Sequence, residues 1–496
     1  MPVKPYARDR EWLLPPNLGD MVPANHLVRF LADFVDGLDL RKSELRQETS
    51  ARGEPEYHVR MMLAAWLYAY MSGVTSSRKL EVLTYENIPV MWLLGGQKPD
   101  HSTLARFRQK NRDRIVAVFK ETARAAVKQG LVDFELQAID GTRVGSVSRD
   151  RALRRKELRA LDAAVARVIN DMEKGIAADE LSGEWPSRRQ KAPKNLRDAQ
   201  KLRDQVKTAI SELDRREEER RGGGKGAVDA ETNERLGPPV NLADPEAVMM
   251  KGRRGYMIGY NAQAAVDSKA QVIVGADVVA AATDNDQMVP MLEAIEETTG
   301  RLADVTVLDG GYHSAKNLEA TQDTETDLYV ADPAMGRKES KGQRRSYHKD
   351  AFEYQEADDT YVCPHGHTLT LEHVQKAKKR GQNEVRIYRC HDCDDCPHKD
   401  DCTRDHRGRS IHVRPQDKLL RRHRAKMRGE RAKVYMRQRA AVVEPVFGIM
   451  KMHMSLDRFR LRGSEAVKAE WHLLCAAYNL RKLFKHGQWT WAEVGV

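Results

Sequence analysis

Three acidic residues lie at positions from which they can bind a divalent cation. Asp140 precedes Gly141 in a short strand-like run, and Asp309 follows a second such run, Asp304–Leu308. Glu444 stands in an apolar and basic stretch. Two Mg²⁺ or Mn²⁺ ions promote phosphodiester hydrolysis or transfer when a few carboxylates converge on them from fixed elements. We therefore predict such a site at these three residues, although an Asp-Gly pair at a strand end is more often a turn.

The segment around Glu444 has the periodicity of an amphipathic helix. Apolar residues recur at three- and four-residue steps and predict a buried stripe of Val443, Phe447, Met450 and Met454. Glu444 and Lys451 lie on a neighbouring face, where they can meet a metal ion and a phosphate. Pro445 lacks an N–H donor and restricts Glu444, so we expect the helix to start or kink there. An ordinary surface Glu–Lys pair is the alternative.

Five of the six cysteines are clustered in a second candidate metal site. They are Cys363, Cys390, Cys393, Cys396 and Cys402. In a reducing compartment this close spacing favours a structural Zn²⁺ over disulfides. An iron–sulfur cluster is the lesser option, because Cys402 lies too far along the chain from Cys396 for the cysteine spacing of a ferredoxin-like cluster motif. Free buried thiols are the remaining alternative. Cys475 lies in an apolar helical stretch and is expected in the core.

The composition indicates a globular protein of two or three domains with a polyanionic partner. The chain has 496 residues, of which 41% are hydrophobic and 32% charged, and its formal net charge is +11. Lys and Arg gain affinity for nucleic acid by releasing counterions from phosphates. The start of the chain lacks the apolar core of a signal peptide and no run of eighteen apolar residues occurs, so we expect a cytoplasmic location, acting at the nucleoid, and no membrane contact.

Residues 1–130 read as helical and form the expected DNA-binding domain. Apolar spacing predicts helices over His26–Asp36 and Val59–Met71, the second apolar on nearly every face. A later helix, a turn and a third helix from about Ser102 are similar to a helix-turn-helix, with Arg78, Lys79, Arg106, Arg108 and Lys110 expected on the surface. A plain helical bundle with solvated basic residues explains the pattern equally well.

The rest of the chain alternates strands and helices around two insertions. Strand patterns at Asp140, Tyr256–Val266 and Ala270–Val279 precede a helix over Gln287–Thr299 and the strand before Asp309. Residues 151–225 have two apolar stripes that predict a charged helical hairpin, either a solvated arm or a surface for DNA or subunit contact. Residues 336–430 form a basic, cysteine-rich insertion whose Lys and Arg density suits phosphate contacts.

The chain resembles the DDE transposases of bacterial insertion sequences, specifically the IS-eleven-eighty-two group. The matching motifs are NHLVRF (25–30), GVTSSRKLE (73–81), PDHSTLARFR (99–108), DGT (140–142), GYNAQAAVD (259–267), LDGGYHS (308–314) and VEPVFGIMK (443–451). The resemblance implies an α/β fold: a ribonuclease-H-like mixed sheet with flanking helices, catalytic over residues 131–335 and 431–496. It also implies that Asp140, Asp309 and Glu444 are the catalytic triad that binds Mg²⁺ or Mn²⁺.

The same resemblance implies partners and further site residues. Such an enzyme binds double-stranded DNA at the terminal inverted repeats of its element, cleaves there and joins the 3′ hydroxyl to target DNA. Pairing of two ends implies a homodimer or larger assembly. Related families place a Tyr and an Arg before the Glu and a Lys after it. Lys451 keeps its place, but position 440 is Ala, so Arg437 and Arg439 are the nearby substitutes for DNA contact.

Two other functions fit the same residues. A ribonuclease-H-like nuclease would hydrolyse DNA without joining it to a target. A retired transposase would serve as a zinc-containing DNA-binding protein, in which case substitution of the carboxylates would leave its function intact. The presence of all three acidic residues favours the active transposase.

Overall fold

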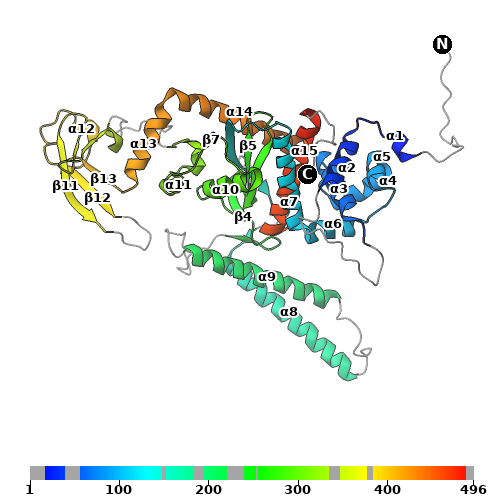
Figure 1. Cartoon of the computed structure of the whole chain (residues 1–496). Helices are drawn as coiled ribbons and strands as arrows, with labels where there is room; N and C mark the ends of the chain where they lie inside the picture. The colour runs from blue at the N-terminus through cyan, green and yellow to red at the C-terminus, as the bar shows by residue number, and fades with distance from the viewer. Residues whose placement is uncertain are drawn as a thin grey trace, which may run out of the picture. The chain divides into compact units, whose positions relative to one another are not determined.

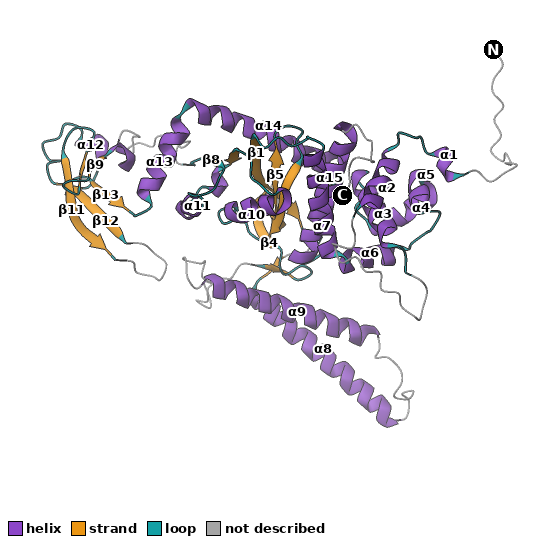
Figure 2. Ribbon diagram, viewed as in Figure 1, coloured by secondary structure: helices purple, strands orange, loops and turns teal. Residues whose placement is uncertain are grey.

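The computed structural model describes residues 17–38, 56–147, 152–182, 194–220, 239–252, 255–333, 347–376 and 384–486. The chain forms two compact units, one of residues 1–282, 291–303 and 441–496 and the other of residues 283–290 and 304–440. Both contain helices and strands (Figures 1 and 2), which confirms the mixed α/β composition. The expected domain limits at residues 225 and 335 lie outside the described residues. Among the described helices, none has the length and apolarity that a membrane span requires.

Helices from both ends of the sequence pack together in the first unit. They are α1 (Leu18–Met21), α2 (Leu27–Gly37), α3 (Val59–Met71), α4 (Ser77–Glu86), α5 (Ile88–Leu93), α6 (His101–Lys110), α7 (Arg112–Lys128) and α15 (Ser464–His486). The continuous burial of α3 from Met62 to Met71 confirms the expected core helix. Helix α15 packs against α3, α7 and a strand. Its buried Trp471 donates Nε1–H to the Gln263 carbonyl at 2.9 Å, which fixes the helix to the sheet.

An antiparallel sheet forms the other part of the first unit. Its strands are β1 (Leu136–Gly145), β4 (Val248–Gly252), β5 (Gly255–Asp267) and β6 (Ile273–Val279). Strand β5 pairs antiparallel with β1, β4 and β6. The pairing of β5 with β6 confirms the strand patterns predicted over Tyr256–Val266 and Ala270–Val279. A separate pair joins β2 (Ala152–Leu153) to β3 (Val240–Asn241). Strand β5 is buried from Gly259 onward, so both of its faces are covered there.

The predicted helical hairpin is present in the first unit as α8 (Arg155–Ser182) and α9 (Lys194–Arg220) (Figure 1). Two small apolar clusters join the helices, one around Leu158, Val206 and Leu213 and the other around Val165 and Ile169. Val168 continues the apolar spacing of α8 but is 47% exposed. Its neighbour Ile169 fills the place instead, because the two-helix contact covers only a narrow stripe.

The second unit contains a parallel pair of strands and a separate sheet. Strands β7 (Val305–Leu308) and β8 (Asp327–Val330) pair in parallel, and the one-turn η1 (Gly310–Tyr312) and helix α11 (Ala315–Ala320) connect them. The separate sheet is antiparallel in the order β13 (Ser410–Val413), β12 (Val385–Cys390), β11 (Thr368–Gln375), β10 (Thr360–Val362) and β9 (Glu353–Gln355). The unit also includes η3 (Lys349–Ala351), α12 (Lys399–Cys402) and α13 (Asp417–Arg428). Helices α10 (Met288–Thr299) and α14 (Glu430–His453) have residues in both units.

Candidate active site

Asp140 lies in the middle of β1. The strand continues to Gly145, and Asp140 stands opposite Ala264 of β5 in an unbroken register. The expectation that Asp140 ends a strand is therefore wrong, and so is the alternative of a turn, because backbone pairing to β5 holds the Asp-Gly pair extended. The carboxylate is half-buried, and its Oδ1 accepts the N–H of Gly141 at 2.8 Å. The long strand thus gives this acidic side chain a fixed direction.

Glu444 lies on the exposed side of α14. The predicted stripe is confirmed, since Val443, Met450 and Met454 are fully buried and Phe447 is 8% exposed. Glu444 and Lys451 are exposed on the neighbouring face. The helix begins at Glu430, so the expectation that it starts at Pro445 is wrong.

A side chain from the sheet accounts for the proline inside α14. A proline at position 445 cannot donate to the Ala441 carbonyl one turn earlier. Gln271 replaces that donor: its Nε2–H bonds to the Ala441 carbonyl at 3.1 Å and to the Val442 carbonyl at 3.4 Å. Lys482 in turn donates to Oε1 of Gln271 at 3.2 Å. The backbone group freed by Pro445 is therefore satisfied by tertiary structure.

One side-chain contact joins α14 to β1 inside the first unit. Lys451 Nζ donates to Thr142 Oγ1 at 2.5 Å. Residues two apart on a strand point to the same face, so Thr142 and Asp140 share one face of β1. Glu444 and Lys451 share one side of α14 in the same way. The contact therefore places the carboxylates of Asp140 and Glu444 on the sides of β1 and α14 that face each other.

Asp309 is placed at the end of β7, as the sequence predicts. It caps η1, and its Oδ1 accepts the Gly311 N–H at 2.8 Å. Burial raises the pKa of the Asp309 carboxyl; the Gly311 N–H and Arg439 oppose this shift, whereas Asp284 adds to it. A Cβ at Gly311 would lie 2.9 Å from Asp284 Oδ2 and 3.0 Å from Asp309 Oδ1. Glycine at 311 thus lets a second carboxylate approach Asp309.

Asp284 is a further carboxylate near the predicted site. It lies in the run Thr283–Asp286, where a helix cap or turn is the simpler role for an acidic residue. In the second unit Asp284 instead lies beside Gly311, next to the carboxyl of Asp309. The only signal in the sequence is the density of acidic residues just after β6, and that signal does not distinguish Asp284 from Asp286.

The structure distinguishes the two arginines that precede Glu444. Arg439 is half-buried, and its charge opposes the rise in the pKa of Asp309. Arg437 is exposed, and its charge acts on the Glu430 carboxyl, whose pKa is lowered chiefly by a hydrogen bond from Lys433. Within the second unit, Arg439 is therefore the arginine close to a predicted catalytic residue.

The predicted basic surface of the N-terminal helices is partly present. Arg78 and Lys79 are exposed on α4, and Arg106 is exposed on α6. Asp100 caps α6 by accepting the Thr103 N–H at 2.7 Å. A contact of 2.9 Å between the Glu81 carboxylate and the His101 imidazole joins α4 to α6. These two helices can therefore present their basic side chains as one surface.

Arg108 is not part of that surface. It is 4% exposed, its guanidinium lies 3.9 Å from the centre of the Trp66 ring, and it donates to the Tyr70 hydroxyl at 2.8 Å. Tyr70 donates in turn to Glu470 at 3.0 Å. The expectation that Arg108 is exposed for DNA is therefore wrong, because this guanidinium completes a buried polar network that joins α3, α6 and α15.

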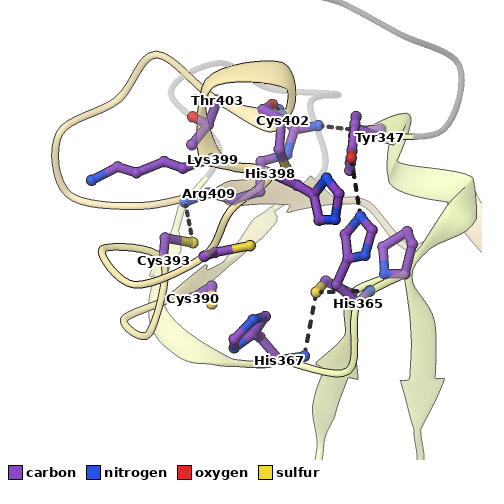
Figure 3. A pocket seen from close by; sticks show the side chains of 13 residues that line it. Tyr347, His365, His367, Cys390, Cys393, His398, Lys399, Cys402, Thr403 and Arg409 are labelled. Carbon is purple, nitrogen blue, oxygen red and sulfur yellow. Dashed lines mark hydrogen bonds between the residues drawn. The ribbon is translucent and has the colours of Figure 1, made fainter.

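The clustered cysteines line one cavity in the second unit. All five cysteines are among its lining residues, together with His365, His367 and His398, which Figure 3 labels. Burial raises the pKa of the Cys390 thiol to about 12, and its hydrogen bond with Cys393 adds to the shift. Burial raises the pKa of Cys402 to about 11; Arg409 opposes this, and Cys393, Cys363 and Cys396 add to it. Across the described ranges, no three His, Cys, Asp or Glu side chains stand in an arrangement ready to hold a metal ion.

Two transposase families match the chain. A model described as a transposase domain (DUF772) matches residues 16–110, and one described as a transposase DDE domain matches residues 362–484. The first match covers the N-terminal helices, and the second includes all five clustered cysteines and Glu444. A comparison with curated proteins finds no match. The chain belongs to the DDE transposases of insertion sequences. The pairing of the two domains is compatible with the IS-eleven-eighty-two group, and transposases as a class act on DNA.

Proposed function

We propose that this transposase binds the terminal inverted repeats of its own insertion sequence, cleaves at their ends and transfers the 3′ hydroxyl to target DNA. The contact between Lys451 and Thr142 is the observation that supports the proposal, because it joins the side of α14 that carries Glu444 to the face of β1 that carries Asp140. Asp309, at the end of β7, is the third member. Along the chain, a strand with Asp140, an antiparallel pair, a helix and two parallel strands follow the order of a ribonuclease-H-like domain.

The carboxylates fit two Mg²⁺ or Mn²⁺ ions. These cations prefer oxygen ligands and keep several waters, so half-buried or exposed carboxylates on regular elements are suitable donors. Asp284 beside Asp309 places two like charges together, and a bound cation relieves that repulsion. When bound, a pair of ions activates the attacking oxygen and stabilises the leaving oxygen. The protein's share is to hold Asp140, Asp309 and Glu444 in fixed directions.

The basic residues supply DNA contact in this proposal. Lys451 adjoins the candidate catalytic face and reaches a phosphate at the end of the element, while Arg439 contacts DNA near Asp309. Arg78, Lys79 and Arg106 contact the repeats from the N-terminal domain, residues 1–130. Arg437 is a peripheral contact from the exposed side of α14. A homodimer or larger assembly then brings two ends together.

The catalytic domain in this proposal comprises residues 131–335 and 431–496, with the hairpin of residues 151–225 and the cysteine-rich residues 336–430 inserted in it. The DDE match starts at residue 362, inside the second insertion. We therefore treat the cysteine-rich sheet as a regular part of this family's catalytic region. The hairpin is either a solvated arm or a surface for subunit or DNA contact.

Strand transfer on labelled duplexes tests the proposal. The duplexes carry the DNA that flanks this gene, and wild type is compared with Asp309→Asn in Mg²⁺ or Mn²⁺. We expect metal-dependent cleavage at a terminal repeat and a joined product, both lost in the variant. Cleavage without joining would instead identify a hydrolytic nuclease. Tight binding of the repeat without cleavage by either protein would identify a DNA-binding protein.

A further inference from the structure

The five-stranded sheet of the second unit encloses a small core. Its buried members are Phe352, Tyr361, Leu369, Tyr388, Cys390, Cys393 and Ile411, with Cys363 and Cys402 packed at the edge. A sheet with so little apolar volume usually needs a cross-link or a structural metal. The cysteines are free thiols, so disulfides do not stabilise this sheet and a bound metal ion is the remaining means. We propose that Cys363, Cys393, Cys396 and Cys402 bind one structural Zn²⁺ in this cavity, with Cys390 outside the ligand set.

Backbone amides already point at the sulfur atoms of two proposed ligands. Cys363 Sγ accepts the N–H of His365 at 3.4 Å and the N–H of His367 at 3.3 Å. Cys393 Sγ accepts the N–H of Arg409 at 3.3 Å. Hydrogen bonds of this kind stabilise the thiolate form, which is the form that binds zinc. The loop after β10 and the loop before β13 thus supply these donors.

The choice of four thiols follows from their surroundings. Cys363, Cys393, Cys396 and Cys402 line the same cavity and lie on the loops and the short helix around it. Cys390 also lines the cavity, but it is 1% exposed and lies within β12, where pairing with Leu369 of β11 fixes its backbone. Cys396 and Cys402 lie on the short loop and turn of α12, where rotation about χ1 can bring their sulfur atoms to a shared ion. Four thiolates complete a tetrahedral zinc site.

Two of the three histidines at the cavity, His365 and His398, have other partners. His365 and His398 stack with ring centres 3.9 Å apart and an interplanar angle of 12°. The Nε2 atom of His365 also lies 3.0 Å from the Tyr347 hydroxyl. These contacts hold both rings at the rim of the cavity (Figure 3). We therefore assign them to covering the site, not to binding the ion.

Arg409 supplies the charge that such a site requires. Zinc bound by four thiolates is a doubly negative group, and burying it is costly without a cation nearby. Arg409 lines the cavity, and its backbone N–H lies 3.3 Å from Cys393 Sγ. Its Nε atom is buried with no acceptor among the described residues. The zinc–thiolate group provides both an acceptor and a countercharge for this guanidinium.

Metal content of the full chain tests the proposal. Protein expressed in zinc-supplemented medium and purified without chelators is analysed by mass spectrometry of its metals, for wild type, Cys396→Ser, Cys402→Ser and Cys390→Ser. Cys475→Ser, in the core of the first unit, is the matched control. We expect about one zinc per chain in wild type and in the Cys390 and Cys475 variants, and a loss of most of the metal in the other two.

X-ray absorption at the zinc edge identifies the atoms bound to zinc in the wild-type protein. It therefore tests the proposal even if a variant fails to fold. Four sulfur neighbours at about 2.3 Å support the assignment, whereas a nitrogen neighbour would replace a proposed cysteine by a histidine and overturn it. Wild-type protein without stoichiometric zinc, or with iron and sulfide instead, overturns the proposal. So does zinc that survives Cys396→Ser but is lost in Cys390→Ser.

Discussion

The carboxylates of the first unit and the thiols of the second are brought together over very different lengths of chain. Thr142 and Lys451, whose contact joins the strand of Asp140 to the helix of Glu444, are 309 positions apart. Four of the five clustered cysteines lie between Cys390 and Cys402. The carboxylates stand on a strand and a long helix and remain accessible, whereas the cysteines lie on loops and at the ends of short elements around one small cavity.

This difference corresponds to the chemistry expected of each site. A site that must admit DNA and ions that retain water needs exposed oxygen ligands held by rigid, distant elements. A structural site for a soft, fully coordinated ion needs short loops and exclusion of water. Changes in the first region should therefore affect activity more than folding, and changes in the second should affect folding more than activity.

The largest expected effect is on activity. Asp140→Asn and Glu444→Gln should each reduce strand transfer by about a thousandfold, since losing about 4 kcal/mol of transition-state stabilisation has that effect. Neither change should lower the urea midpoint. Asp286→Asn is the control, because the Asp286 side chain is 72% exposed and pairs only at the surface with Lys316. A decrease smaller than tenfold in either test variant would remove that residue from the catalytic set.

Substitutions of buried Arg108 and exposed Arg106 should have different effects on protein stability and on DNA binding. Arg108→Gln should lower the free energy of unfolding by about 3 kcal/mol, because Glu470 would be left buried without its cation at 4.0 Å. Arg106→Gln should change stability by less than about 0.5 kcal/mol and weaken binding to the repeat. Urea denaturation and a DNA-binding titration measure both variants. Equal stability of the two would contradict the burial of Arg108.

Two glycines of the cysteine-rich sheet form a matched pair. Gly408 has φ +90° and a Cβ there would lie 2.2 Å from the Cys390 carbonyl oxygen, whereas Gly366 has φ +87° and open space around it. We expect Gly408→Ala to cost about 3 kcal/mol and Gly366→Ala about 1 kcal/mol, because both incur backbone strain but only the first also incurs a clash. Hydrogen exchange of β12 and β13 would report the difference, and equal protection in the two variants would refute it.

Substitution of Lys451 tests whether DNA binds where α14 contacts β1. Lys451→Ala should weaken binding to the terminal repeat by about tenfold, or roughly 1.4 kcal/mol, and reduce the salt dependence of binding by about one ion. Affinity for Mg²⁺ should not change, since an ammonium group cannot bind a cation. Titrations at several salt concentrations measure this effect. Unchanged end binding and cleavage would leave Lys451 a structural partner of Thr142.

The smallest expected effect concerns the support of α14. Gln271→Ala should destabilise the chain by about 1 kcal/mol, the usual worth of a hydrogen bond, because the Ala441 carbonyl loses its donor. In a Pro445→Ala background the helix supplies its own donor, so the same change should cost less. A double-mutant cycle by urea denaturation measures the coupling. Additive effects would show that Gln271 does not compensate for the proline.

Local pattern was enough to predict several features of this protein. The stripe from Val443 to Met454 repeats at the helical period, so its burial follows from the sequence alone. Asp309 follows a short apolar run that can only be a buried strand, and the hairpin of α8 and α9 has its own two stripes. The cysteines are close in sequence, so their convergence needs little of the fold. The transposase family was likewise recognisable from motifs spread over most of the chain.

Tertiary structure decided the features that depend on distant partners. Asp140 lies in mid-strand because β5 pairs with the chain on both sides of it. Arg108 is buried because Trp66 and Tyr70 surround it, although its spacing matches that of exposed Arg106. Pro445 stays inside a helix because Gln271, far away in sequence, satisfies its orphaned carbonyl. Periodicity shows which face of an element is apolar, but a polar side chain is buried or exposed according to the partner that the fold brings to it.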